Sequence, residues 1–194
     1  MTIGSTFASV LALAQEGDDH ALTVLYKDVA PLVMGYLRSN RVENVEDVAG
    51  DVFVSMVTSI GGFGGGEDQF HSWLLTITHR RMIDDRRRRT RRREDTVAPV
   101  DLDRDGESGR DVAAVMDAGV TAVNRLDVGD VLAAMDHLTP EQREVVMLRV
   151  LADLPIRDIA AIVARPETAV RALLRRGVAA IHRNLTSSDS DVAS

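Results

Sequence analysis

Apolar side chains recur at helical spacing along much of the chain, and no alternating pattern is long enough to predict a strand. Near the N-terminus they follow the i, i+3, i+4, i+7 spacing of one helix face at Phe7, Val10, Leu11 and Ala14. A second stripe comprises Val45, Val48, Val52, Met56 and Ile60. A third, which we start at Asp68 as a helix N-cap, comprises Phe70, Trp73, Leu74 and Ile77. Residues 1–93 are therefore predicted to form a helical bundle.

A glycine-rich segment, 61–66, separates the second stripe from the third. Five glycines surround Phe63 there, and glycine is costly inside a helix or strand. We expect a mobile loop.

Residues 126–186 are predicted to form further helices. Thr139, Pro140 and Gln142 fit a capping box, in which Thr139 caps the helix and Gln142 reaches back to it. A short amphipathic helix follows, and a break at 164–166 separates it from a longer one that is rich in arginine. The apolar positions of the two helices are Ile156, Ile159, Ala160 and Val163, then Val170, Leu173, Leu174, Gly177 and Ile181. This arrangement is typical of a helix-turn-helix.

The remaining segments are polar. Residues 94–125 are acidic and contain Pro99, Gly106 and Gly109, which is the composition of a flexible linker, and 187–194 is expected to be a disordered tail. The predicted fold is all-α, with two small helical domains joined by a flexible acidic linker.

Charge is distributed unevenly. The chain has a net charge of -7, yet residues 80–93 hold nine arginines against Asp84 and Asp85, so this window carries +7 and the rest of the chain -14. Such a helix could bind phosphate, whereas the simpler alternative is a solvated basic tail.

Composition excludes several classes of protein. The absence of cysteine excludes disulfide scaffolds, thiolate metal sites and cysteine nucleophiles. The five histidines are dispersed, and we find no carboxylate or second histidine at metal-ligand spacing from them. No strand-to-helix glycine motif for phosphate is present. We therefore expect a non-enzyme with no metal or other cofactor. Apolar stretches fall short of the roughly 20 residues that span a bilayer, which predicts a cytoplasmic protein without membrane insertion.

Two parts of the chain resemble one protein family. The segment Leu138-Thr-Pro-Glu-Gln-Arg-Glu144, followed by Leu154-Pro-Ile-Arg-Asp-Ile-Ala160 and Arg165-Pro166, resembles the fourth conserved region of extracytoplasmic-function sigma factors of bacterial RNA polymerase. Val45-Glu-Asp-Val-Ala-Gly-Asp-Val-Phe53 resembles the polymerase-binding helix of that family. Phe70-His-Ser-Trp-Leu-Leu-Thr-Ile77 with Ile83-Asp-Asp-Arg86 resembles its promoter-melting region.

The resemblance implies that residues 1–93 bind the clamp helices of core RNA polymerase, with Asp47 and Asp51 at the acidic positions. These two lie i, i+4 on one helix face, although solvated surface charges would look the same. The family linker follows the RNA path of the polymerase, where an acidic chain can imitate nucleic acid. A simple spacer is the alternative.

The same resemblance implies that the loop and the next helix capture a flipped base of the minus-ten element and hold the melted strand. Extruding a base costs a few kcal/mol, which a pocket and a cationic grip must offset. The pocket would be formed by Phe63, Glu67, Asp68 and Gln69. Phosphate would be held by His79, Arg80, Arg86, Arg87 and Arg88. Trp73 lies in the apolar stripe, which favours a core position over a base-stacking platform.

The helix-turn-helix, by the same resemblance, would recognise duplex DNA at the minus-thirty-five element. Its candidate contacts are Thr168, Arg171, Arg175 and Arg176. The family usually has an arginine where Leu173 stands, so base contacts are expected to differ there. An anti-sigma factor is a further expected partner.

We interpret the chain as a sigma factor that directs promoter recognition and opening. The first alternative is an autonomous helix-turn-helix regulator that binds operators as a dimer. A helical interaction module without a DNA function is the second.

Overall fold

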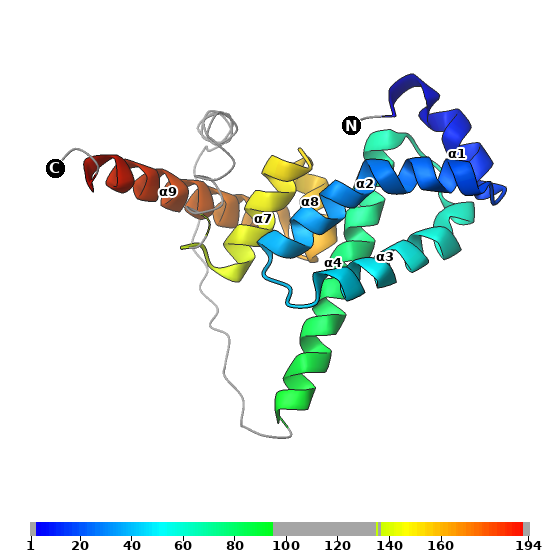
Figure 1. Ribbon diagram of the computed structural model, residues 1–194. Coiled ribbons are helices and arrows are strands. Elements are labelled where there is room, and N and C mark those ends of the chain that lie inside the picture. The colour runs from blue at the N-terminus through cyan, green and yellow to red at the C-terminus, as the bar shows by residue number, and fades with distance from the viewer. Residues whose placement is uncertain (1–2, 95–134, 136, 192–194) are drawn as a thin grey trace. The chain divides into compact units, whose positions relative to one another are not determined.

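The computed structural model describes residues 3–94, 135 and 137–191, and these residues contain helices and no strand. The chain divides into two compact units, 1–104 and 105–194. Figure 1 labels the helices of each unit. The predicted all-α architecture of the described residues is confirmed. The predicted linker, 94–125, lies outside the described residues except for Glu94, which ends a helix.

The described residues of the N-terminal unit, 3–94, form a bundle of four α-helices. Its elements are η1 (Gly4–Thr6), α1 (Phe7–Gln15), α2 (Asp19–Ser39), α3 (Val45–Ser59), η2 (Ile60–Gly62) and α4 (Glu67–Glu94). The long helix α4 packs against α3 and α2, while α1 packs against α2. The fully buried residues of this core include Leu25, Val29, Val33, Leu37, Val52, Met56, Phe70, Leu74 and Leu75.

The predicted apolar stripes are confirmed in part. All five positions of the α3 stripe are buried, and in α1 only Val10 is half-exposed. In α4 the stripe is displaced. Trp73 and Ile77 are half-buried, while Leu75, Thr78 and Met82 are fully buried. The reason is that α4 contacts two helices at once, which widens its buried face.

Helix α4 begins one residue before the predicted cap. Its first helical residue is Glu67, and the Gln69 side chain accepts a hydrogen bond from the Gly66 N–H at 3.0 Å. The Gly66 carbonyl accepts the Phe70 N–H at 2.9 Å. The prediction that Asp68 is the N-cap is therefore wrong, because Gly66 takes that place with Gln69 as the reciprocal partner.

The C-terminal unit contains α7 (Pro140–Leu151), α8 (Ile156–Val163) and α9 (Glu167–Asp191), with α7 and α8 both packed on α9. The capping box is confirmed. The Gln142 N–H donates to Thr139 Oγ1, and the Thr139 N–H donates to Gln142 Oε1, both at 3.3 Å. The five predicted apolar positions of α9 are all buried.

A three-residue turn, 164–166, joins α8 to α9 and confirms the helix-turn-helix. Ala164 ends α8 in the left-handed conformation, with φ 52°, and the Arg165 N–H donates to the Ala160 carbonyl at 3.1 Å. The disordered tail predicted from 187 is wrong as far as Asp191, because α9 continues to that residue. No glycine or proline follows Gly177 to end the helix. Residues 192–194 lie outside the described residues.

Candidate nucleic-acid interface

Helix α4 presents exposed arginines on its outer side. Arg80, Arg87, Arg88 and Arg91 are exposed, and Arg80, Arg87 and Arg91 lie on nearly the same line of the helix. None of the four makes a hydrogen bond or ion pair with the residues that the structure describes. Asp84 lies on the same side and is half-buried. Four guanidinium groups are thus available to an anionic ligand.

Other arginines of α4 hold the bundle together. Arg86 Nη2 donates to the Asn40 carbonyl at 3.0 Å, so this predicted phosphate contact is engaged within the fold. Arg81 Nη2 donates to Ser55 Oγ at 2.7 Å. These bonds fix α4 to the end of α2 and to α3. The sequence does not distinguish them from the exposed arginines.

Arg89 is also engaged, in ion pairs with Glu43 at 2.6 Å and Asp85 at 2.9 Å. His79 is half-buried, and its Nδ1 shares a hydrogen bond with the Tyr36 hydroxyl at 3.3 Å. The predicted phosphate contacts therefore divide into exposed Arg80, Arg87 and Arg88, and engaged His79 and Arg86.

The glycine-rich segment has defined contacts where a mobile loop was expected. Gln15 Nε2 donates to the carbonyls of Ile60 at 2.9 Å and Phe63 at 2.7 Å. The Phe63 ring packs against Phe70 and Trp73, with centroids 5.5 and 5.2 Å away. Trp73 thus packs within an aromatic cluster while remaining half-exposed.

The four predicted pocket residues have different contacts in this structure. Phe63 packs on aromatic rings, and Gln69 bonds to the Gly66 backbone. The two carboxylate oxygens of Glu67 accept the N–H groups of Ile3 and Gly4 at 2.6 and 2.9 Å. Only Asp68 is exposed without such a contact among the described residues. Base capture would require Phe63 and Gln69 to leave their present partners.

Helix α9 exposes all four of its predicted DNA contacts, namely Thr168, Arg171, Arg175 and Arg176. Arg171 pairs with Glu167 at 3.1 Å, and the Arg176 Nε lies 3.4 Å from the Ala172 carbonyl. An exposed pair of this kind contributes little stability, so Arg171 can exchange its partner readily. Leu173 is buried, so its side chain faces the core and away from this surface.

The outer face of α3 contains two residues that the sequence analysis missed. Val54 is 65% exposed and Val57 47% exposed, beside exposed Asp47 and Asp51. Their offset from the buried stripe is visible in the sequence, because both valines fall between stripe positions. The face combines two carboxylates with apolar side chains that a partner could cover.

None of the described helices is long and apolar enough to cross a membrane.

The chain matches two protein-family models, one over the helices of each unit. Residues 25–92 match Sigma-70 region 2, and residues 129–181 match Sigma-70, region 4, which together cover more than half of the chain. The chain belongs to the sigma-70 family. Within it the chain is an extracytoplasmic-function (ECF) sigma factor, as its relatives show.

Two relatives are ECF RNA polymerase sigma factors. BldN of Streptomyces coelicolor is 27% identical over 174 residues, which cover 89% of this chain and 63% of BldN. This chain therefore spans less than two thirds of BldN. SigD of Mycobacterium tuberculosis is 26% identical over 182 residues, or 90% of this chain and 82% of SigD.

A solved structure shares the fold. CnrH, in complex with the cytosolic domain of CnrY, aligns with a TM-score of 0.56 and 22% identity over 94% of this chain and 99% of that one.

Proposed function

We propose that this ECF sigma factor binds core RNA polymerase, recognises two promoter elements and helps to open the DNA. One observation supports the proposal. Each of the two family matches falls within one compact unit, and each unit has a helix that exposes arginines. A dimeric operator-binding protein needs one such helix per subunit. Two different ones in fixed order favour a subunit that recognises two separate DNA elements.

Core polymerase would bind the outer face of α3. Asp47 and Asp51 can pair with basic groups on a partner, and Val54 and Val57 supply apolar area beside them. If the two carboxylates were only solvated surface charges, there would be no reason for exposed valines beside them. The combination therefore favours a protein-binding surface over the simpler interpretation of scattered surface charge.

The DNA would contact both units. Arg80, Arg87 and Arg88 of α4 would hold the phosphates of the melted minus-ten strand, with Arg91 as an additional contact. Arg86 and His79 would mainly position α4, since their side chains already bond to α2. The base pocket at 63–69 remains a prediction, which requires the Phe63 and Gln69 contacts to open.

At the minus-thirty-five element, α9 would enter the major groove. Thr168 and Arg171, two exposed residues near the start of α9, would lie closest to base edges, and Arg175 and Arg176 would follow along the groove and backbone.

We also propose an anti-sigma partner, as the resemblance to ECF sigma factors implies. CnrH, which shares this fold, is found in complex with another protein domain, the cytosolic domain of CnrY. Such a partner would compete with the polymerase for the sigma factor. The chain would act in the cytoplasm and leave catalysis to the polymerase.

The test is run-off transcription from a genomic promoter library of the source organism. Purified chain plus core polymerase should give specific transcripts that neither component gives alone. Replacing both Arg171 and Arg175 with alanine should reduce them, whereas Arg157→Ala, an exposed change on α8, should not. Tight, site-specific binding of the chain alone as a dimer would support the autonomous regulator instead. No association with polymerase and no effect of the double variant would support an interaction module.

A further inference from the structure

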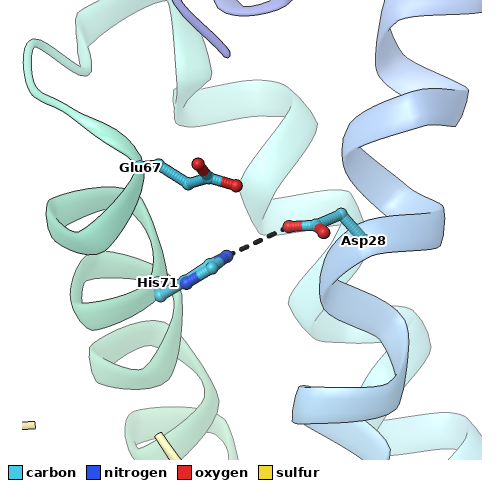
Figure 2. A group of neighbouring side chains, drawn as sticks. All are labelled: Asp28, Glu67 and His71. Carbon is cyan, nitrogen blue, oxygen red and sulfur yellow. Dashed lines mark hydrogen bonds and ion pairs between the residues drawn. The ribbon is translucent and has the colours of Figure 1, made fainter. Parts of the chain in front are cut away.

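Three potential metal ligands converge between α2 and the first turns of α4 (Figure 2). Asp28 comes from α2, and Glu67 and His71 come from α4, four residues apart. Each offers one ligand atom, and these atoms all lie within 4.8 Å of one another. His71 Nε2 is 3.0 Å from Asp28 Oδ2. The sequence-based statement that no histidine has a carboxylate at ligand spacing is therefore wrong, because Glu67 and His71 share one helix face.

Burial gives a separate indication of a ligand. The Asp28 side chain is only 5% exposed, and its Oδ1 has no hydrogen-bond partner among the residues that the structure describes. A buried carboxylate oxygen without a partner is costly, because burial removes its hydration. The carboxylate is directed toward His71 and Glu67 in Figure 2. A cation that takes both oxygens of the Asp28 carboxylate as ligands would satisfy Oδ1.

The surroundings orient the ligands. Glu67 accepts backbone N–H groups from Ile3 and Gly4 at 2.6 and 2.9 Å, which fixes its carboxylate while leaving lone pairs available. Glu67 and His71 are half-buried, so an ion could reach them from solvent.

From this geometry we propose that Asp28, Glu67 and His71 form a binding site for a divalent transition-metal ion, with Zn²⁺ as the probe. An imidazole nitrogen with two carboxylate oxygens suits zinc and similar ions, whereas Mg²⁺ and Ca²⁺ prefer oxygen ligands throughout. Solvent would complete the coordination. The bound ion would tie α2 to the start of α4 and, through Glu67, to the N-terminal residues. The site shares Glu67 with the predicted base pocket but uses none of the exposed arginines, so its metal affinity can be measured without DNA or polymerase.

The test is metal titration of the untagged, full-length chain after treatment with a chelator. Competition with a chromophoric chelator should show one tightly bound Zn²⁺ per chain, and Zn²⁺ should raise the thermal unfolding temperature by mass action. Asp28→Asn and His71→Gln should each weaken binding by at least about tenfold, since even outer-shell changes cost 10- to 100-fold. His20→Gln, at an exposed position of the same helix as Asp28, should leave the affinity unchanged.

Circular dichroism of the metal-free variants checks that each is folded. If Asp28→Asn or His71→Gln unfolds, the half-buried Glu67→Gln variant decides, with the same expected loss of affinity. Co²⁺ provides a second readout, because a visible absorption band should appear in the parent and in His20→Gln but not in the ligand variants. Binding no stronger in the parent than in the folded ligand variants, or no stoichiometric binding at all, would overturn the proposal.

Discussion

At the scale of single residues, burial decides what each arginine does. Arg143 belongs to the segment that resembles sigma region 4, yet it is only 6% exposed and contacts the backbone just before α7. Its Nε and Nη2 donate to the Met135 carbonyl at 3.1 and 3.0 Å, and Nη2 also donates to the Leu138 carbonyl at 3.2 Å. Arg143 therefore stabilises the approach to α7 and is not available to DNA.

We predict that Arg143→Met lowers the free energy of unfolding of the C-terminal unit by about 2–4 kcal/mol, because two buried carbonyls lose a charged donor. Hydrogen exchange of the α7 and α9 amides measures the free energy of unfolding of this unit. Fluorescence of Trp73, the chain's single tryptophan, reports on the N-terminal unit separately. Arg157→Met, at an exposed position, should change stability by no more than about 0.5 kcal/mol. Equal effects of the two substitutions would contradict a structural role for Arg143.

At the scale of helices, close approach determines where α7 and α9 pack. Gly177 is buried in α9, and a Cβ added to it would lie 2.7 Å from Val146 Cγ2 and 3.6 Å from the Gln142 carbonyl oxygen. Helix propensity alone would favour alanine at this position. The packing of α7 opposes that preference.

Gly177→Ala should destabilise the C-terminal unit by a net of about 1 kcal/mol. Overpacking costs roughly 1–3 kcal/mol, whereas the higher helix propensity of alanine stabilises the helix by about 1 kcal/mol. In a Val146→Ala background the same change should be neutral or stabilising, which hydrogen exchange of α9 would show as a coupling energy. Gly50→Ala is the matched control, since its Cβ would meet nothing within 4 Å, and it should stabilise α3 by about 1 kcal/mol. If Gly177→Ala and Gly50→Ala changed the stability in the same direction, the close contact at Gly177 would be refuted.

At the scale of the whole molecule, the proposed surfaces for polymerase and for the two DNA elements lie on different helices. The outer face of α3 carries carboxylates and exposed valines, whereas α4 and α9 carry exposed arginines. The overall charge of -7 hides this separation. Variants of each surface should therefore affect separate steps of initiation.

We expect Asp51→Lys and Val54→Asp each to weaken binding to core polymerase by about tenfold or more, or 1.4 kcal/mol. Asp51→Lys places a like charge against the basic groups of the partner, and Val54→Asp replaces an apolar contact by a carboxylate that binding would bury. Glu16→Lys, an exposed charge reversal at the end of α1, should have no effect. The double alanine variant of Arg171 and Arg175 should keep its polymerase affinity and lose promoter affinity in the holoenzyme. Fluorescence anisotropy with labelled chain measures the first step, and labelled promoter the second. Loss of both affinities in every variant would argue against separate surfaces.

Much of this protein follows from the sequence alone. Helix periodicity, the capping box at Thr139 and the break at 164–166 are local signals, so they predicted the all-α fold and the helix-turn-helix. The polar face of α9 followed in the same way, because residues three and four apart share a helix face wherever the helix lies. The resemblance to ECF sigma factors rested on the same residues.

Only the tertiary structure decided which polar side chains are engaged. Arg86 and Arg87 are adjacent and chemically identical, yet the first bonds to Asn40 and the second is exposed. Glu67, predicted for a base pocket, lies beside Asp28 and His71, a neighbourhood that the sequence did not predict. The physical reason is that burial and pairing depend on which residue of another helix lies opposite. That juxtaposition arises from the packing of helices far apart in the chain, which local patterns do not encode.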